Sequence, residues 1–532
     1  FHKRELVRIY PYPPGDTENT VSGYPISAEV IPPKGTSLAA GFPLIHWTTT
    51  GSAPFNDLVM TATGQPDEYA AEIPAQALGT TVSYYIEAEN SSGVNAIYPL
   101  VAPDGMLSFN VRIDDEPPVL SRYERQASAC AGQWPPSVRV LCKDDMSTPE
   151  VKLVYSINGS PQPDVTLTRD SLCYWYSGMM GGAVSEGDLV KYHLEATDNA
   201  VSPNTGVLPP IGEVYCPITG PGSIAVVDFS PQPRTGPFIA GTLGEFGIPY
   251  TYYTTWPSDW SAHDTWFICL GVFFADNYIL STQEAGEIVD ALQNGANIYL
   301  ESNDTWCFDP AKAILDPWFK VQEISDGNDL SGGVSGQSGS IMAGLSLDYA
   351  AENAFMDEIG AVSPAKMMFK SISDNKGRAV QYDSGSYKTV ANSFVMGGLC
   401  DSAYPDTRKE ILMRVLDFFD VDISLYTAET ASLGNNVPIR IRGEPGHPYL
   451  FLGSFGDYFA QTGYGSFRLD PAWLFYIYMG ILPGSGEMEF IASIPRDESL
   501  VGLEVHLQAV TGEKIEYGKS HLTNREIMTI TE

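Results

Sequence analysis

Polar and acidic side chains follow apolar runs in the middle of the chain, and these are the residues that could bind a ligand. One group follows the run IAVV and another follows NIYL, where two strands are expected to end. In open parallel sheets, ligands bind beyond the carboxyl ends of the strands. The sequence therefore predicts a ligand-binding crevice lined by Asp228, Ser230, Glu301, Asn303 and Asp304.

Three of these side chains, Asp228, Glu301 and Asp304, could converge on a cation, because carboxylate oxygens are the ligands that hard cations prefer. Carboxylates at strand ends also remain solvated or cap nearby helices. The identity of a metal is therefore left open at this crevice. No other cofactor is expected, and Ca²⁺ at the domain junctions is the alternative that the acidic composition favours.

Nucleophilic catalysis is not expected from this part of the chain. Cys307 in ESNDTWCF has no flanking glycines, and no histidine lies between His263 and His447. A cysteine needs a base within hydrogen-bond reach to act as a nucleophile near neutral pH. Ser230 and Ser302 lack the G-x-S-x-G pattern of a nucleophile elbow. We therefore expect no catalytic residues and no enzymatic activity.

The elements that must position the crevice are alternating strands and helices. Ser281 and Glu284 have the spacing of a capping box before the helical pattern TQEAGEIVDALQ, and Gly295 follows its end. The apolar runs TWFICLGV and NIYLES and the helical pattern RKEILMRVLDFF continue the alternation. This alternation is typical of a parallel sheet with helices on both faces. The sequence predicts such an α/β domain over residues 221–421.

The order of these elements resembles the class I glutamine amidotransferase-like fold, which is flavodoxin-like, in the degenerate form embedded in large secreted bacterial proteins. In active members of that family, a cysteine on a tight, glycine-flanked elbow follows a central strand, and a His-x-Glu lies downstream. This chain has ESNDTWCF at the comparable place and lacks the histidine. The resemblance therefore implies the fold without the activity.

The regions on either side carry strand patterns, and two segments of the N-terminal region are duplicated. VSYYIEAEN (82–90) reappears as VKYHLEATDN (190–199), and HWTTTG (46–51) as VYSING (154–159), each 108 residues later. An exact offset over two segments indicates duplication of a sandwich-sized module. The modules resemble the immunoglobulin-like and fibronectin type III-like domains of secreted bacterial proteins. We expect β-sandwiches over residues 1–113, 114–220 and 422–532.

The charge of the chain excludes two classes of partner. A net charge of −35 over 532 residues repels phosphate backbones and anionic lipid, so nucleic-acid partners are not expected. The longest apolar run, residues 266–280, is too short for a bilayer span and contains Asp276, so membrane insertion is not expected. The acidic segment from Asp114 to Pro118 is expected to be a stiff linker.

Four of the seven cysteines fall in the second predicted sandwich. None lies in a C-x-x-C motif, which argues against a zinc site. We therefore expect at least one disulfide among Cys130, Cys142, Cys173 and Cys216. Disulfides persist in oxidising compartments, so the expected location is secreted, extracellular or on the cell surface.

The function that we expect is that of a non-catalytic secreted or cell-surface scaffold or adhesion protein, which binds protein partners or self-assembles. Two alternatives remain open. One is an accessory, non-catalytic portion of a larger secreted hydrolase, a peptidase or a glycosidase. The other is glycan binding by a platform of Trp473, Phe475, Tyr476 and Tyr478, although these aromatic side chains are expected to lie mainly on a buried face.

Overall fold

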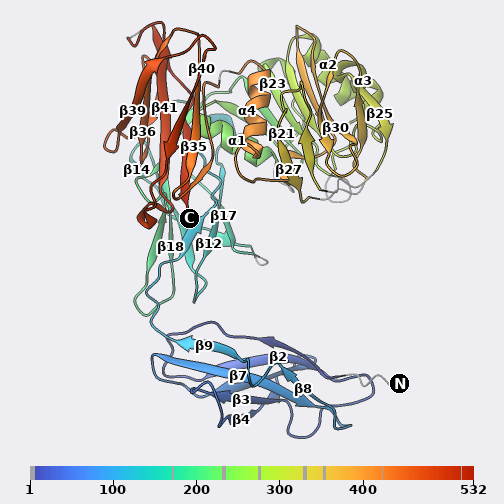
Figure 1. Cartoon of the computed structure of the whole chain (residues 1–532), viewed down its shortest axis with the longest axis vertical. Coiled ribbons are helices and arrows are strands. Elements are labelled where there is room, and N and C mark those ends of the chain that lie inside the picture. The colour runs from blue at the N-terminus through green and yellow to red at the C-terminus, as the bar shows by residue number, and fades with distance from the viewer. Residues whose placement is uncertain are drawn as a thin grey trace.

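The structure is a computed structural model that describes residues 6–170, 173–230, 235–272, 277–327, 332–351, 355–421, 423–516 and 518–532. It is β-rich and multidomain, with several separate sheets. Figure 1 shows the N-terminal sandwich at one end of the molecule and the remaining domains gathered at the other. Within the described parts of the chain, no helix has the length and apolar character needed to cross a membrane.

The N-terminal β-sandwich consists of two sheets packed over one apolar core. One sheet has the order β1–β2–β6–β5, and the other has the order β4–β3–β7–β8, with β9 also paired to β7. Its strands are β1 (Arg8–Tyr12), β2 (Tyr24–Ile31), β3 (Leu44–Thr48), β4 (Asn56–Val59), β5 (Thr61–Ala62), β6 (Glu68–Ile73), β7 (Thr80–Glu89), β8 (Asn95–Tyr98) and β9 (Leu107–Val111).

The second β-sandwich has its own core, between the sheet β10–β12–β17–β16 and the sheet β11–β20–β18–β13–β14. In the second sheet, β15 also pairs with β13 and β19 with β18. Its strands are β10 (Val119–Ser121), β11 (Ala129–Cys130), β12 (Ser137–Lys143), β13 (Glu150–Ile157), β14 (Ser160–Pro161), β15 (Val165–Thr166), β16 (Thr168–Arg169), β17 (Trp175–Met179), β18 (Leu189–Thr197), β19 (Thr205–Leu208) and β20 (Val214–Thr219).

The duplicated segments occupy equivalent places in the two sandwiches. Trp47 in β3 lies opposite the buried Tyr84 in β7. Tyr155 in β13 lies opposite the buried Tyr192 in β18 in the same manner. The two halves of the repeat therefore form the same antiparallel pair, in the same register, in each sandwich.

The structure does not confirm the disulfide predicted in the second sandwich, where all four cysteines are free. Cys130 lies opposite Thr219 in the parallel pair of β11 and β20, three residues beyond Cys216. Three residues along a strand are about 10 Å, further than a disulfide spans. Cys142 lies in the opposite sheet, and burial raises the pKa of its thiol to about 12.

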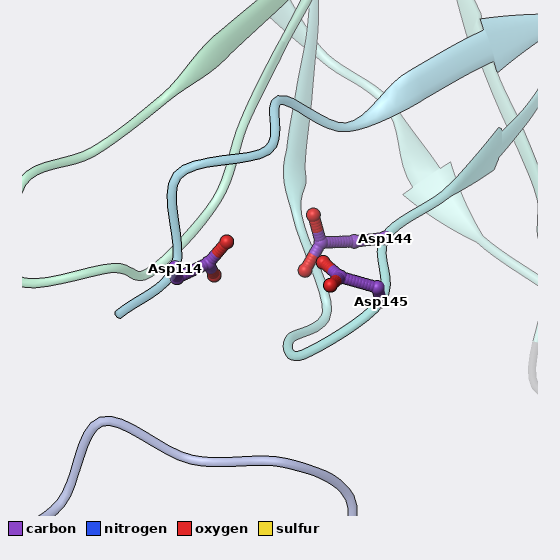
Figure 2. Close-up of side chains that lie close together, drawn as sticks. All are labelled: Asp114, Asp144 and Asp145. Atoms are coloured by element: carbon purple, nitrogen blue, oxygen red, sulfur yellow. The ribbon is translucent and has the colours of Figure 1, made fainter. Parts of the chain in front are cut away.

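The linker between the two sandwiches begins beside a loop of the second sandwich. Asp114 leaves the last strand of the first sandwich close to the β12–β13 loop, which carries Asp144 and Asp145 (Figure 2). The backbone N–H of Asp114 donates to Glu18 Oε1 (3.1 Å), and the N–H of Val201 donates to Glu18 Oε2 (2.5 Å). Side chains of both sandwiches thus meet at this junction.

The central domain is built on one sheet with the order β22–β21–β23–β24–β31–β30–β29–β26–β27–β32, while β25 pairs with β28. Its helices are α1 (Thr235–Phe246), α2 (Thr282–Gln293), α3 (Lys312–Phe319) and α4 (Arg408–Phe418). Its strands are β21 (Ile224–Asp228), β22 (Tyr250–Tyr253), β23 (Thr265–Cys269), β24 (Asn297–Glu301), β25 (Val321–Ser325), β26 (Val334–Gly336), β27 (Ser346–Tyr349), β28 (Glu358–Ala361), β29 (Lys366–Ser371), β30 (Gly377–Asp383), β31 (Lys388–Asn392) and β32 (Leu399–Cys400).

The prediction of a mainly parallel sheet is not supported for this domain as a whole, because the sheet is mixed. The strands from β22 to β31 are parallel neighbours. The strands from β31 to β32 pair antiparallel. Short turns at 372–376 and 384–387 join β29 to β30 and β30 to β31. Such short connections produce antiparallel pairs, since a parallel pair needs a long crossover.

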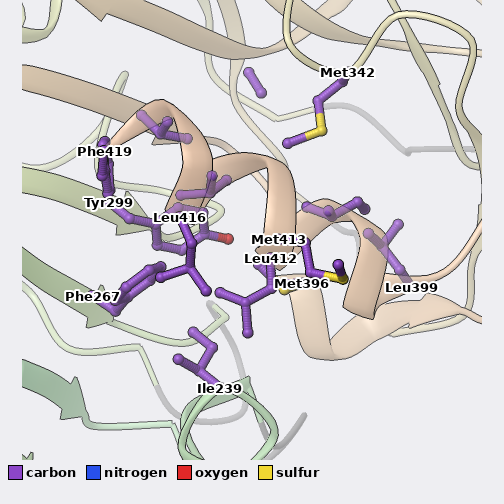
Figure 3. Packing of buried hydrophobic residues seen from close by; sticks show 14 of the residues in the cluster. Ile239, Phe267, Tyr299, Met342, Met396, Leu399, Leu412, Met413, Leu416 and Phe419 are labelled. Carbon is purple, nitrogen blue, oxygen red and sulfur yellow. The ribbon is translucent and has the colours of Figure 1, made fainter. Parts of the chain in front are cut away.

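Helices cover both faces of the central sheet. Leu412 and Leu416 of α4 pack with Ile239 of α1 against Phe267 and Tyr299 of the sheet (Figure 3). On the other face, α2 and α3 form a second core with β23 and β24. The predicted capping box is confirmed, since Ser281 accepts from the N–H of Glu284 (3.2 Å) at the start of α2.

The C-terminal β-sandwich packs the sheet β33–β35–β40 against the sheet β34–β43–β41–β36–β39. In the second of these sheets β42 pairs with β41, and a separate hairpin joins β37 to β38. Its strands are β33 (Leu425–Thr427), β34 (Thr430–Ser432), β35 (Asn436–Arg442), β36 (Pro448–Ser454), β37 (Asp457–Thr462), β38 (Gly465–Leu469), β39 (Phe475–Ile481), β40 (Glu487–Ser493), β41 (Glu504–Gly512), β42 (Ser520–Leu522) and β43 (Glu526–Thr531).

A buried charged network joins the C-terminal sandwich to the second sandwich. Asp457 lies 2.5 Å from Arg525, 3.4 Å from Arg468 and 3.7 Å from Arg125. Arg125 belongs to the second sandwich and also forms an ion pair with Glu504. Burial alone would raise the pKa of Asp457, but Arg525, Arg468 and the other nearby cations hold it well below its usual value. We call these five residues the Asp457 network.

The central domain is tied to the same network. Arg525 donates through Nε to the carbonyl of Glu245 in α1 (2.9 Å). Lys409 of α4 forms a buried ion pair with Glu526 (2.7 Å). Loss of one partner of a buried ion pair leaves the other charge buried and unpaired, which strongly destabilises the folded protein. These contacts therefore hold the second sandwich, the central domain and the C-terminal sandwich in one fixed arrangement.

Candidate functional site

The residues predicted to line a crevice lie at the carboxyl ends of their strands, but several of them are buried. Glu301 at the end of β24 is fully buried and accepts from Tyr299 Oη (2.6 Å) and from the N–H of Met396 (2.8 Å). Burial raises the pKa of this carboxyl group to about 7. Glu301 therefore anchors the segment after β31 to the sheet.

The other predicted residues divide between two places. Asp228 accepts from the N–H of Ser230 (2.9 Å), and both lie at the end of β21 on the side of Glu301. Asn303 is fully buried, and its carbonyl accepts from the N–H of Asp357 (2.9 Å). Asp304 faces a different set of carboxylates, so the structure does not bring all five predicted residues around one opening.

Asp304 belongs to a carboxylate group with Asp326 and Asp357, which offer oxygens within 4.8 Å of one another. Asp357 is fully buried, and its Oδ2 accepts from the N–H groups of Trp306 (2.7 Å) and Cys307 (2.9 Å). Its Oδ1 has no hydrogen-bond partner. Burial raises the pKa of Asp357 to about 8, and that of Asp304 to about 6. Near neutral pH, the group requires a proton or a cation to limit repulsion.

This group predicts a pH dependence of stability. The pKa of Asp357 is about 8 in the folded state and about 4 in the unfolded state. At pH values between these two, Asp357 therefore takes up a proton when the protein folds. Stability therefore falls as the pH rises from 5 to 8, by up to about 1.4 kcal/mol per pH unit from Asp357. We expect Asp357→Asn to flatten this decline in melting temperature, measured with a chelator present.

The comparison isolates Asp357 because its neighbours are unchanged in the variant. The titratable and charged groups that face it are Asp304, Asp326, Cys307 and Arg378. If the melting temperatures of Asp357→Asn and the wild type decline in parallel from pH 5 to 8, Asp357 does not hold a proton in the folded protein.

Cys307 lies at the opposite end of β24 from His447, the histidine that could have served as its base. Its Sγ donates to the carbonyl of Glu358 (3.6 Å), and burial raises the pKa of the thiol well above its usual value. His447 lines a cavity of about 630 Å³ beside the C-terminal end of α4. Phe419 at that end accepts from Asn297 Nδ2 (3.1 Å) at the start of β24, whereas Cys307 follows the other end of that strand.

The largest departure from the sequence prediction is an exposed apolar strand in the C-terminal sandwich. The aromatic residues near β39 were expected to lie mainly on a buried face, and that expectation is wrong for three of them. Trp473 is 50% exposed, Tyr476 61% and Tyr478 45%. Phe475 packs against the sandwich core, and the half-exposed Tyr478 ring lies against Tyr449 and Phe490. The prediction failed because Tyr476 lies on the outer face of its sheet and β39 is the last strand of that sheet, with no neighbour beyond it among the described residues.

Several exposed apolar side chains lie on β39 and just before it. Tyr476 and Met479 lie opposite the half-buried Leu452 and Leu450 of β36, and Ile481 lies opposite Pro448. Met479 is 59% exposed and Ile481 69%. We define the β39 surface as Trp473, Leu474, Tyr476, Met479 and Ile481. Figure 1 shows β39 on the side of the sandwich that faces away from the central domain.

The β39 surface carries no charge of its own. Residues 473–481 read WLFYIYMGI, without an acidic or basic side chain, in a chain whose net charge is −35. Large exposed apolar patches on folded proteins usually mark interaction sites. Edge strands also offer unpaired backbone groups to a further strand. This surface can therefore bury apolar area and form backbone hydrogen bonds at once.

No protein-family model and no curated protein matches the chain. Among solved structures, it resembles the exo-β-1,4-mannosidase Op5Man5 from Opitutaceae bacterium strain TAV5, at 8% identity and a TM-score of 0.26, over 37% of this chain and 35% of that one.

Two further solved structures resemble the chain. One is SGBP-B from a complex xyloglucan utilization locus in Bacteroides uniformis, at 15% identity and a TM-score of 0.20, over 38% of this chain and 48% of that one. The other is trypsin-activated α2-macroglobulin from Escherichia coli, at 8% identity and a TM-score of 0.20, over 99% of this chain and 42% of that one. None of these likenesses reaches the similarity of a shared overall fold.

Proposed function

We propose that this chain is a non-catalytic structural or adhesion protein, secreted or on the cell surface, that associates with further copies of itself through the β39 surface. The observation that carries the proposal is an uncharged, apolar edge strand exposed on a strongly acidic molecule. Elsewhere on the surface, two copies repel one another, because both carry a large negative charge. At β39 each copy offers the other a neutral apolar strand.

Pairing of two β39 strands gives a symmetric contact, since the same surface serves both copies. The Asp457 network supports a structural role, because it fixes the C-terminal sandwich against its neighbours and so fixes the direction in which β39 points. The degenerate amidotransferase-like character of the central domain belongs to the same proposal. The absence of a catalytic pair in it is supported by the buried Cys307 thiol and by the position of His447 near the opposite end of β24.

The double variant Tyr476→Glu, Ile481→Glu tests the proposed contact. Burial of one large apolar side chain contributes about 1.5–3 kcal/mol, so loss of two, with added charge, weakens association by about 100-fold or more. Sedimentation velocity over a wide range of concentrations measures this shift. The matched control is Val21→Glu, Leu100→Glu, which adds the same charge at positions that are 91% and 82% exposed on the first sandwich.

The wild type and the control are expected to associate alike, and the β39 variant is expected to remain monomeric. Association that is equally strong in all three proteins would show that another surface makes the contact. A wild-type protein that stays monomeric at every concentration would contradict the proposed self-association.

Glycan binding is a second candidate, favoured by one observation. Trp473 and Tyr476, three residues apart in the chain, expose half or more of their surface, and exposed aromatic rings provide faces on which sugars stack. A glycan array probed with the intact protein, and with Trp473→Ala, distinguishes this function. Binding that is lost in the variant would favour glycan recognition, whereas an unreactive wild type would exclude it for the glycans on the array.

A further inference from the structure

We propose that a Ca²⁺ ion binds at the junction of the first two sandwiches, held by Asp114, Asp144 and Asp145. The three side chains come from both sides of the junction. Asp114 begins the linker that follows β9, and the two other residues lie in the β12–β13 loop of the second sandwich. This inference is independent of the β39 surface.

The three carboxylates are close enough to share one ion. Each offers an oxygen, and these oxygens lie within 4.8 Å of one another. Figure 2 shows the Asp114 carboxylate pointing across the junction toward the loop that carries Asp144 and Asp145. Oxygens around a Ca²⁺ ion lie at about 2.3–2.6 Å from it, so two ligands can be up to about 5 Å apart.

A second observation is that two carboxylate oxygens of the group have no hydrogen-bond partner. Asp114 is only 3% exposed, and its Oδ1 has no hydrogen-bond partner. Oδ1 of Asp144 is also buried without a partner, while its Oδ2 accepts from the N–H groups of Met146 (3.2 Å) and Ser147 (2.6 Å). Buried carboxylate oxygens without a hydrogen-bond partner are unfavourable, and a cation between these two oxygens would satisfy both.

The surrounding charges fit a cation. Asp198 is a further acidic residue close enough to Asp114 to interact with it electrostatically. Arg112 is the basic residue that pairs with this group. It forms ion pairs with Asp145 and with Asp16 (2.8 Å), which leaves the second oxygen of Asp145 for the ion.

The ligand set selects the metal. All three ligands are carboxylates, which suit hard cations, and the group contains neither the histidine nor the cysteine that Zn²⁺ favours. Carboxylates supplied by two different domains form an irregular, adaptable site. Ca²⁺ accepts such geometry, whereas Mg²⁺ demands a near-ideal octahedron and gives up its water reluctantly. A bound ion would fix the angle between the two sandwiches.

The site is tested with the intact chain, stripped of metal with a chelator and titrated with Ca²⁺ by calorimetry. We expect the wild type to bind Ca²⁺ more tightly than Mg²⁺, and Asp114→Asn, Asp144→Asn to lose at least about 10-fold in affinity, since two charged ligands are neutralised. The matched control is Asp304→Asn, Asp326→Asn, which alters the other carboxylate group and should retain this binding.

Small-angle scattering of the same proteins provides an independent readout. Ca²⁺ is expected to narrow the range of shapes of the wild type and not those of the junction variant. The variant should fold, since it removes repulsion between buried carboxylates, and its melting temperature in chelator should match or exceed that of the wild type. The proposal is overturned if the wild type binds no Ca²⁺, if the junction variant binds it as tightly, or if only the control loses binding.

Discussion

Asp457→Ala is expected to lower the free energy of unfolding by about 3–5 kcal/mol, because it leaves buried cations without their shared counter-ion. Arg525, Arg468 and Arg125 all lie within 4.0 Å of this carboxylate, and each of the three side chains is at most 2% exposed. The variant also loses the acceptor for the N–H of Tyr215 (3.1 Å). The loss therefore falls on the contact between the second and the C-terminal sandwich.

Urea unfolding and the rate of tryptic cleavage measure this effect together, since an opened contact exposes lysine and arginine residues. Glu513→Ala provides the control, because it removes an exposed carboxylate from the same sandwich and should change stability by no more than about 0.5 kcal/mol. Equal unfolding midpoints for the two variants would mean that the Asp457 network does not hold the domains together.

Trp306→Ala is expected to lower the free energy of unfolding of the central domain by about 3–5 kcal/mol, as truncation of a buried aromatic residue does. Trp306 is fully buried and packs on Phe319 with ring centroids 5.2 Å apart. Its Nε1 donates to the carbonyl of Asn392 (2.9 Å), so the variant also leaves a buried acceptor unpaired. The segment that follows β24 is thus part of the core.

Phe308→Ala is the matched control for this prediction. Phe308 lies two residues further along the same segment but is 57% exposed, so its truncation should be nearly neutral. Thermal unfolding of the two variants and of the wild type measures the loss of stability that each substitution causes. A Trp306→Ala protein as stable as Phe308→Ala would indicate that the segment is loosely packed and free to form an open site.

Local patterns predicted the repeats and the helices well. The 108-residue offset in the sequence corresponds to the matching pairs of Trp47 with Tyr84 and of Tyr155 with Tyr192. The capping box at Ser281 marks the start of α2 because the signal and the hydrogen bonds involve the same four residues. Such features depend on neighbours in the chain, which a sequence displays directly.

Features that depend on distant neighbours were not predicted. Asp357 joins Asp304 from a position just before β28, where no pattern marks it as part of a site. Tyr476 is exposed because it lies on the outer face of the edge strand β39, and an apolar strand pattern does not show which of its faces is covered. Asp114 lies near Asp144 and Asp145 only because the folded linker begins beside the β12–β13 loop, and no sequence pattern indicates this proximity.

Amide hydrogen exchange of the intact wild-type chain at low and high concentration tests self-association at β39 most directly. When copies associate, the amides of residues 475–481 are predicted to gain protection, because an added strand occupies the free side of β39. The edge strands β4 and β5 of the first sandwich, in contrast, should exchange at an unchanged rate. Association accompanied by protection elsewhere, with β39 unchanged, would contradict the proposed contact.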